Sequence, residues 1–330
     1  MTRIKTMYTT YRCDAYHVSH GLARNRSRRR RRGVADERDY PRRVPLYTLA
    51  EPADPLLEPV LVAAFDGWID AAGASTAAPE RVADGADLIA GFDGDVLFDF
   101  RSRRPVLDVV DGRLEHLTWP ELTLRRSHHD RRDLLVLTGA EPDFRWQELG
   151  RDLVDLSKRL GVTQWVSLGS IPTAVPHTRP VPVLATASAE GLLADDEQVG
   201  PAGLLRVPSA ALSTLEMAAA DAGIPAVGFY AQVPHYVGGP YAAASIAILE
   251  HLGRHLGVDP PLGDVPDDAM AQRERLDQIV QADDDSRTYV ERLESVVDNQ
   301  EVPTGDELVG EIERFLQERG DGGSTPPGMR

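Results

Sequence analysis

The most constraining feature of the sequence is an alternation of short apolar runs with longer segments that repeat apolar residues at helical spacing. Residues 59–65 form a nearly continuous apolar run, which is typical of a strand covered on both faces. Residues 142–161 then show leucines on one helical face, and Gly161 is placed to end that helix in a left-handed conformation. A second apolar run follows at 164–168. This order of strand, helix and strand predicts parallel βαβ units.

Further segments extend the alternation. Residues Ser213 to Glu216 match a capping box at the start of a helix that Gly223 would end, and another helical pattern at 240–256 ends at Gly257. Further strands are predicted at 95–100, 105–110, 121–125, 133–137, 181–185 and 224–232. We therefore expect an α/β fold, a three-layer α/β/α sandwich with a largely parallel sheet.

The composition changes along the chain and predicts four segments. Residues 1–44 form a disordered Arg-rich extension, and residues 45–260 hold the α/β/α core. Residues 261–319 are rich in Asp, Glu, Gln and Arg with sparse apolar positions, which predicts an acidic helical appendage. Its apolar positions favour helices around Leu276 and Tyr289 and a third from near Thr304. Residues 320–330 are predicted to be a disordered tail.

The net charge is −16, and its distribution is uneven. Residues 1–44 contain 13 Lys or Arg against four Asp or Glu, a balance of +9, so the remainder holds 23 against 48, a balance of −25. An acidic core disfavours nucleic-acid phosphates and anionic membranes, and favours protein partners with basic or apolar surfaces. Two interpretations of the Arg-rich segment stay open: a nucleic-acid-binding arm, or an upstream extension from a misplaced start codon.

The cysteine content and the lengths of the apolar runs limit where in the cell the protein is expected and which chemistry its side chains can perform. The single cysteine, Cys13, allows neither a disulfide framework nor a thiolate metal cluster. No apolar run approaches 18 residues, and the N-terminal residues lack the pattern of a secretory signal. We expect a cytoplasmic protein with no cofactor and no bound metal. Adjacent residues His128 and His129 favour a polar loop over a metal site, because neighbours on an extended chain point in opposite directions.

Polar and glycine-containing segments follow several of the predicted strands. In a parallel sheet, ligands bind beyond the carboxyl ends of the strands, so these segments are candidates for a crevice. Asp66 or Glu141 could act as a general base there and His235 as an acid, whereas turn geometry and helix capping explain the same residues without chemistry. The candidate residues for ligand or partner binding are Asp66, Trp68, Glu141, Ser170, Thr173, His177, Arg179, His235 and Tyr236. No catalytic residue is assigned, since nucleophile-elbow, phosphate-loop and H-E-x-x-H motifs are all missing.

Residues 176–180 place His177, Thr178 and Arg179 between two prolines, which favours an extended segment. Arg179 could bind a carboxylate or phosphate ligand. It could equally pair with a carboxylate of the same fold or of a neighbouring subunit, a use to which arginine is well suited.

Three passages together resemble the proteasome assembly chaperone type 2 family in its actinobacterial form. They are VLVAAFDGWIDA at 60–71, LGSIPTAVPHTRP at 168–180 and VPHYV at 233–237. The resemblance covers about residues 46–300 and implies a phosphorylase-like α/β/α sandwich. It also implies a role in assembling or engaging the proteasome core, which relatives perform partly through a C-terminal hydrophobic-Tyr-any residue ending. This chain ends in PGMR and does not carry that ending.

Two functions of different classes therefore remain. The first is a non-enzymatic protein-binding or assembly factor that forms a homo-oligomer, with a trimer as one form and proteasome core subunits as candidate partners. The second is a small-ligand binder or an enzyme with a nucleoside- or peptide-type substrate in the strand-end crevice, an analogy of fold alone.

Overall fold

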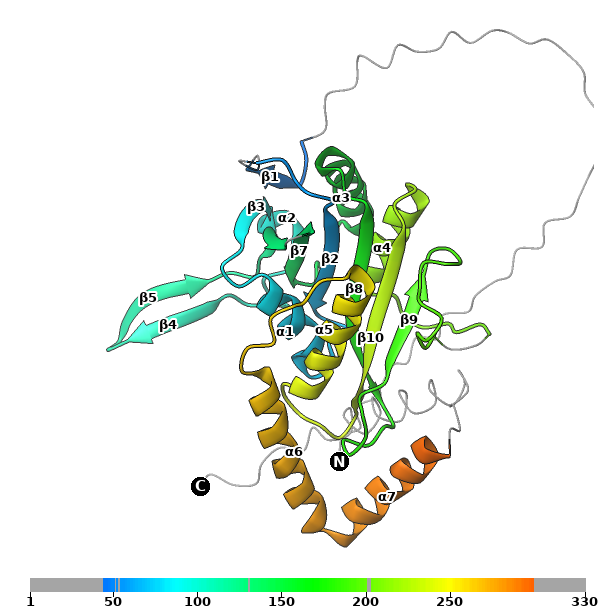
Figure 1. Ribbon diagram of the computed structural model, residues 1–330. Helices are drawn as coiled ribbons and strands as arrows, with labels where there is room; N and C mark the ends of the chain where they lie inside the picture. Colours follow the sequence, from blue (N-terminus) through cyan, green and yellow to red (C-terminus); the bar gives the residue numbers. More distant parts are fainter. Residues whose placement is uncertain (1–43, 51, 53, 130, 201–202, 300–330) are drawn as a thin grey trace, which may run out of the picture. The chain divides into compact units, whose positions relative to one another are not determined.

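The structure is a computed structural model that describes residues 44–50, 52, 54–129, 131–200 and 203–299 (Figure 1). The predicted Arg-rich extension, the third helix near Thr304 and the tail at 320–330 lie outside the described residues. The domain boundaries at 44, 260 and 319 stay predictions.

Within the described residues, an eight-stranded sheet has the order β1-β3-β6-β7-β2-β8-β10-β9. The four central strands, β7, β2, β8 and β10, run parallel, whereas the strands on either side pair antiparallel. The predicted α/β fold is confirmed, and its parallel part occupies the middle of the sheet. The strands are β1 (Tyr47–Leu49), β2 (Val60–Asp66), β3 (Asp87–Phe92), β6 (Leu122–His129), β7 (Arg132–Ala140), β8 (Gln164–Thr173), β9 (Val183–Ala187) and β10 (Ala226–Pro234).

Helices cover both faces of the sheet. In β2, every second residue from Leu61 to Phe65 belongs to the core under α3 and α4, and the residues between, from Val60 to Ala64, belong to the core under α1 and α5. Because successive residues of a strand face opposite sides, a strand between two helical layers needs a continuous apolar run. The helices are α1 (Ala74–Val82), α3 (Trp146–Leu160), α4 (Ala211–Asp221) and α5 (Ala242–Leu256).

The predicted ends of two helices are confirmed. Gly161 follows α3 with a φ of 71°, and Gly257 follows α5 with a φ of 65°. Both angles lie in the left-handed region that glycine adopts without a steric cost.

Four local predictions are wrong. Residues 176–180 were expected to be extended, but the chain turns at His177 and Thr178, where the Arg179 N–H donates to the Pro176 carbonyl at 3.5 Å. His128 and His129 were expected in a polar loop, but they form the end of strand β6.

The other two wrong predictions concern the starts of helices. The expected strand at 95–100 begins with a helical turn, α2 (Gly94–Leu97), because the Asp93 carboxylate accepts a hydrogen bond from the backbone N–H of Asp95 and caps it. The expected capping box is not formed, since α4 begins before it, after Ala210, without a side-chain cap. Glu216 instead accepts a hydrogen bond from Tyr230 at 3.3 Å.

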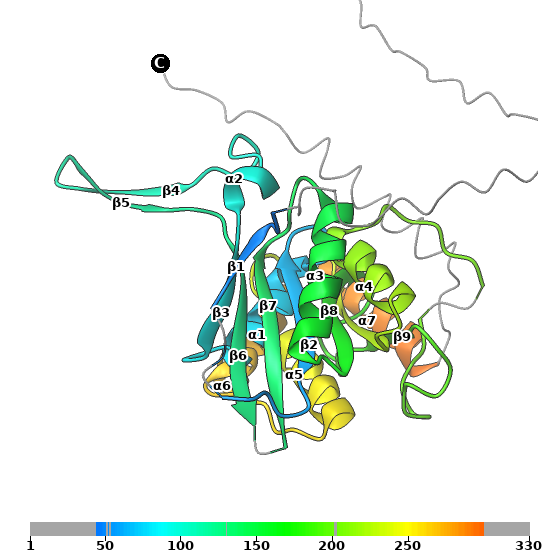
Figure 2. The ribbon, with the colours of Figure 1, turned by 90° about the horizontal axis from the view of Figure 1, so that it is seen from above.

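A two-stranded hairpin projects away from the main sheet (Figures 1 and 2). It consists of β4 (Val106–Val110) and β5 (Arg113–Thr118), of which only the first was expected. Asp111 and Gly112 form the turn with φ values of 51° and 76°. Two consecutive left-handed residues are the signature of a type I′ turn, and Asp-Gly is a preferred sequence for it.

Two helices follow the core, as the apolar positions around Leu276 and Tyr289 predict. They are α6 (Val265–Gln281) and α7 (Asp284–Asp298). Ala282 and Asp283 separate them, and Asp283 caps α7, because its side chain accepts a hydrogen bond from the Ser286 N–H at 2.8 Å.

Candidate functional site

The candidate site begins where the parallel strands end. Asp66 is the last residue of β2 and pairs in register with Ala140 of β7, while Thr173 ends β8 opposite Pro234 of β10. His235 follows directly. The parallel pairing therefore brings the predicted strand-end segments to one edge of the sheet, as the sequence suggested.

Glu141 uses both carboxylate oxygens to hold the backbone. Oε2 accepts from the Trp68 N–H at 2.8 Å, and Oε1 accepts from the Ala211 N–H at 2.7 Å, at the start of α4. A Cβ on Gly67 would lie 2.1 Å from Oε2, so only glycine permits this approach. Glu141 thus ties the loop after β2 to the positive end of a helix dipole.

Asp66 lies in a different environment from Glu141. Its exposed carboxylate forms an ion pair with Arg103, which also donates to the Asp66 backbone carbonyl at 2.8 Å. Trp68, two residues on, leaves about half of its surface exposed, at 52%. The two carboxylates predicted as alternative bases therefore serve separate contacts.

Ser170 and Asp70 fix the loop after β2. The Asp70 carboxylate accepts from the hydroxyls of Ser75 and Thr76 at 2.7 Å each and so holds the start of α1. The buried Ser170 hydroxyl donates to the carbonyl of Ala71, in the 3-10 turn η1 (Ala71–Gly73), at 3.0 Å. The hydroxyl of Ser170 is thereby committed to shaping this loop.

His235 connects β8 to the C-terminal helices. Its Nδ1 lies 3.2 Å from the carbonyl oxygen of Thr173, and its Nε2 lies 3.3 Å from the hydroxyl of Tyr289 on α7. The Thr173 side chain is buried, and among the described residues its hydroxyl has no hydrogen-bond partner.

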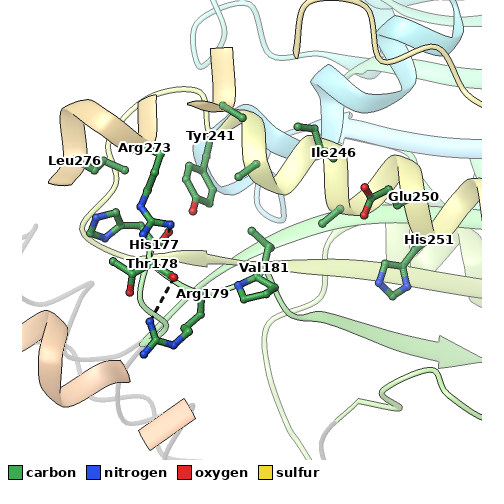
Figure 3. A pocket seen from close by; sticks show the side chains of 14 residues that line it. His177, Thr178, Arg179, Val181, Tyr241, Ile246, Glu250, His251, Arg273 and Leu276 are labelled. Atoms are coloured by element: carbon green, nitrogen blue, oxygen red, sulfur yellow. Dashed lines mark hydrogen bonds between the residues drawn. The ribbon is translucent and has the colours of Figure 1, made fainter. Parts of the chain in front are cut away.

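His177 is buried at the junction with α6. The Tyr236 hydroxyl lies 2.7 Å from Nδ1, and Asp277 of α6 lies 3.2 Å from Nε2. Arg273 of α6 donates to the His177 carbonyl at 3.0 Å, and Figure 3 shows the two side chains next to each other. Burial lowers the pKa of His177 despite the nearby Asp277 carboxylate, and burial raises the pKa of Tyr236 to about 12. A neutral His177 accepts from Tyr236 and donates to Asp277.

Arg179 binds the last turns of α7. Its Nε and Nη2 donate to the two carboxylate oxygens of Asp298 at 2.8 and 2.7 Å, and its Nη1 lies 3.2 Å from Glu294. The Thr178 hydroxyl also donates to Glu294. This two-point guanidinium–carboxylate geometry is the structural alternative considered for Arg179, pairing within the same fold.

A cavity of about 590 Å³, which we call the strand-end cavity, opens beyond β2, β8 and β10. Among the nine candidate residues, Trp68 and His235 line it, and the other seven do not. Its wall is mainly apolar, with contributions from Ile69, Ile171, Leu184, Leu205, Val207 and Val233. The cavity brings together segments that are far apart in the sequence, as the crevice prediction requires.

Tyr230, which lines the strand-end cavity, and its partner Glu216 are residues that the sequence analysis missed. A Cβ on Gly169 would lie 2.4 Å from the Tyr230 ring, and one on Gly228 would lie 2.7 Å from it, so the two glycines form a slot for the ring. Burial raises the pKa of Glu216, although hydrogen bonds from Ser167 and Tyr230 act in the opposite direction. Gly228 inside the predicted strand 224–232 was the available signal, since a glycine within a strand marks close approach.

A second cavity of about 590 Å³ lies along α5 and α6 (Figure 3). His177, Arg179 and Arg273 line it together with Glu250 of α5. Arg179 is paired with α7, and Arg273 lies 3.1 Å from Asp277 on its own helix. The Arg179–Asp298 ion pair attaches α7, and the hydrogen bond from Arg273 to the His177 carbonyl attaches α6.

The part of the chain that the structure describes contains no cluster of three or more His, Cys, Asp or Glu side chains suited to a metal ion. The His128 ring instead lies 2.9 Å from Asp133, a buried carboxylate. No helix among the described residues is long and apolar enough to cross a membrane.

Comparison with known proteins places this geometry in a family. The profile of the PAC2 family matches residues 64–280, which include the loop after β2, the 168–180 segment and the turn after β10. The chain belongs to the PAC2 family. This confirms the resemblance to the proteasome assembly chaperone type 2 family. A search of curated proteins found no match.

Solved structures of related proteins agree with the PAC2 assignment. Rv2714 of Mycobacterium tuberculosis, a protein of unknown function, is 34% identical with a TM-score of 0.72, over 80% of this chain and 94% of its own. Rv2125 of the same organism, described as a proteasome-assembly chaperone homologue, is 33% identical with a TM-score of 0.62, over 70% of this chain and 99% of its own. PbaB of Pyrococcus furiosus, an archaeal proteasome activator, is 16% identical with a TM-score of 0.55, over 71% of this chain and 97% of its own. At that identity PbaB supports the fold alone.

Proposed function

We propose that this PAC2 protein is a non-enzymatic assembly factor of the cytoplasm that works as a homo-oligomer, such as a trimer, and binds subunits of the proteasome core. The observation that carries the proposal is the hairpin of β4 and β5, in which every residue is exposed. An assembly factor must present a surface that its own fold leaves open, and the hairpin is such a surface.

The hairpin is strongly apolar for an exposed element. Val106 is 64% exposed and Leu114 is 74% exposed, and Leu107 and Leu117 lie opposite each other across the strand pair. A two-stranded hairpin is only marginally stable in water without further cover. Contiguous exposed apolar residues mark protein interaction sites, and covering them is favourable by about 25 cal/mol per Å² of apolar surface.

Aromatic side chains continue the apolar character at the base of the hairpin. Trp119 follows β5 and is half exposed, and its ring packs edge-on against Phe100 with 4.7 Å between centroids. Phe144 is also half exposed. Large aromatic side chains are enriched in protein interfaces, so this region supports a binding face that extends beyond the hairpin strands.

The relatives support a protein partner of a particular kind. One relative at 33% identity is described as a proteasome-assembly chaperone homologue. The acidic balance of residues 45–330 favours partners with basic or apolar surfaces. Together these observations favour proteasome core subunits as the partners of this chain.

The enzyme alternative has weaker support from the geometry. Both oxygens of Glu141 hold backbone N–H groups, and Asp66 is paired with Arg103. Of the three residues considered for acid–base chemistry, only His235 lines the strand-end cavity. Asp66 and Glu141 do not line the cavity, so neither is placed within hydrogen-bond reach of a molecule inside it.

The proposal is tested by chemical crosslinking of the full chain, alone and with the purified proteasome core particle of the same organism, followed by mass spectrometry. The chain has only two lysines, so a dihydrazide that links carboxylates is the suitable reagent, and Asp108, Asp111 and Glu115 place reactive groups on the hairpin. We expect hairpin-to-hairpin links between copies and additional links to core subunits. Links between copies without any to the core particle would contradict the proteasome partner, and the absence of both would contradict the assembly function.

A further inference from the structure

The strand-end cavity has the size and enclosure of a small-molecule site. Its volume of about 590 Å³ falls in the range of ligand pockets, which are usually a few hundred to a thousand Å³. It lies at the carboxyl ends of β2, β8 and β10, where open α/β sheets bind ligands. It is separate from the hairpin that carries the proposed assembly function.

The charge of the lining restricts which ligands fit. Among the described residues that line the strand-end cavity there is no Lys or Arg, and Asp70 is the carboxylate. Both carboxylate oxygens of Asp70 already accept hydrogen bonds from the hydroxyls of Ser75 and Thr76 at the start of α1. His235 is the lining side chain that can carry a positive charge, and its ring nitrogens already contact the Thr173 carbonyl and the Tyr289 hydroxyl. A phosphate or carboxylate ligand would enter an apolar space beside the Asp70 charge, without a Lys or Arg to offset its desolvation.

Three of the polar residues of the lining carry hydroxyl groups. Thr186 of β9, Ser213 of α4 and Tyr230 of β10 contribute hydroxyl groups from three elements that meet there. The Tyr230 hydroxyl is 3.3 Å from Glu216, which holds the ring in its glycine slot. A ligand would meet these hydroxyl-bearing residues and, elsewhere, a mainly apolar lining that also includes Trp68 and His235. Such a lining orients a mainly apolar molecule by its polar group.

We propose that the strand-end cavity is a binding site for an uncharged, mainly apolar small molecule whose single polar group faces Thr186, Ser213 and Tyr230. The site excludes anions, nucleotides and other phosphate esters included. The inference does not depend on the assembly function, because it rests on different residues.

The test is a fluorescence titration of the full chain with two naphthalene probes, neutral N-phenyl-1-naphthylamine and anionic 8-anilinonaphthalene-1-sulfonate. We expect saturable binding of the neutral probe with one site per chain and at least about tenfold weaker binding of the anionic probe. The double variant Leu107→Asp/Leu114→Asp serves as the background throughout, so that the apolar hairpin does not contribute to the signal.

A matched pair of loop variants locates the probe. Val207 lines the cavity and is 54% exposed, whereas Leu204 on the same loop is 79% exposed and does not line it. Val207→Asp should weaken binding of the neutral probe by about tenfold, and Leu204→Asp should change it by less than about twofold. Ser213→Arg should strengthen binding of the anionic probe, because it supplies the missing cation.

Three results would overturn the proposal. The first is no saturable binding of the neutral probe, which would favour a protein segment over a small molecule as the occupant of the cavity. The second is equal loss of binding in Val207→Asp and Leu204→Asp. The third is tighter binding of the anionic probe than of the neutral one to the chain with native Ser213. Circular dichroism of each variant confirms that a loss of binding does not reflect unfolding.

Discussion

Strand β2 and the β4–β5 hairpin are built from similar residues and have opposite environments. Val60 to Phe65 are all buried between two helical layers, whereas Val106 to Thr118 are exposed along both hairpin strands. The apolar side chains of β2 find their cover within the chain, and those of the hairpin do not. The difference shows that apolar content alone does not decide burial, and that a strand is covered where the topology places helices on both of its faces.

The largest expected loss of stability comes from a substitution in the buried core. Leu153 on α3 is fully packed under the sheet, so Leu153→Ala should lower the free energy of unfolding by about 2 to 5 kcal/mol. Leu114→Ala on the hairpin is the matched control and should change it by less than about 0.5 kcal/mol in the monomer. Urea unfolding at low protein concentration measures both, and similar losses would show that the hairpin packs within its own chain.

A second prediction concerns the glycine slot. Gly169→Ala would place a methyl group 2.4 Å from the Tyr230 ring, so it should cost about 3 kcal/mol through overpacking. Gly91→Ala, also in a strand, meets nothing within 4 Å and is the control. Equal unfolding free energies for the two variants would contradict the claim that Gly169 is required for the close approach of the Tyr230 ring.

A third prediction concerns Glu141. Glu141→Gln keeps one oxygen acceptor and turns an amide toward the other N–H, so it should lower the free energy of unfolding by about 1 to 2 kcal/mol. Glu115→Gln on the exposed hairpin should leave stability unchanged. Full retention of stability in Glu141→Gln would mean that the tie between the loop after β2 and α4 is dispensable, and would reopen a chemical role for this carboxylate.

The smallest effect is a pH dependence at the attachment of α6. Burial lowers the pKa of His177, so the unfolded chain binds more protons than the folded chain in the pH window between the unperturbed pKa of about 6.5 and the lower pKa of the folded state. This contribution to stability is fully present above that pH and is lost as the pH falls through the folded pKa. Asp277, Arg273, Glu294 and Tyr236 face the ring and set the size of the effect.

Hydrogen exchange of α6 between pH 5 and 7 measures this dependence. The α6 amides should exchange faster at the lower pH after correction for intrinsic rates, and His177→Gln should flatten the profile. His116→Gln on the exposed hairpin is the control. A profile in His177→Gln that matches the unsubstituted chain would assign the dependence to another group.

Much of the fold was predictable because the spacing of apolar residues along the sequence indicates most of its strands and helices. The continuous apolar run of β2 and the leucine face of α3 each reflect a packing environment that repeats along the element. The hairpin turn at Asp111 was less visible, since one dipeptide and not a period specifies it. Local capping by Asp93 likewise overrode the strand pattern that follows it.

The site was less predictable than the fold, for a physical reason. The partners of His177 and Arg179 lie about a hundred residues away, at Asp277 and Asp298, and no sequence period links them. The strand ends could be assigned to one edge of the sheet from the parallel order. Which side chains enter the cavity depended on how each loop turns, and that is decided by contacts such as those of Glu141.

Sedimentation velocity of the full chain over a hundredfold range of concentration tests the central claim, that the hairpin joins copies of the protein, most directly. The chain should sediment as an oligomer, and Leu107→Asp/Leu114→Asp should sediment as a folded monomer with unchanged far-ultraviolet circular dichroism. Sedimentation of the native chain as a monomer throughout, or of the double variant as the same oligomer, would contradict the account.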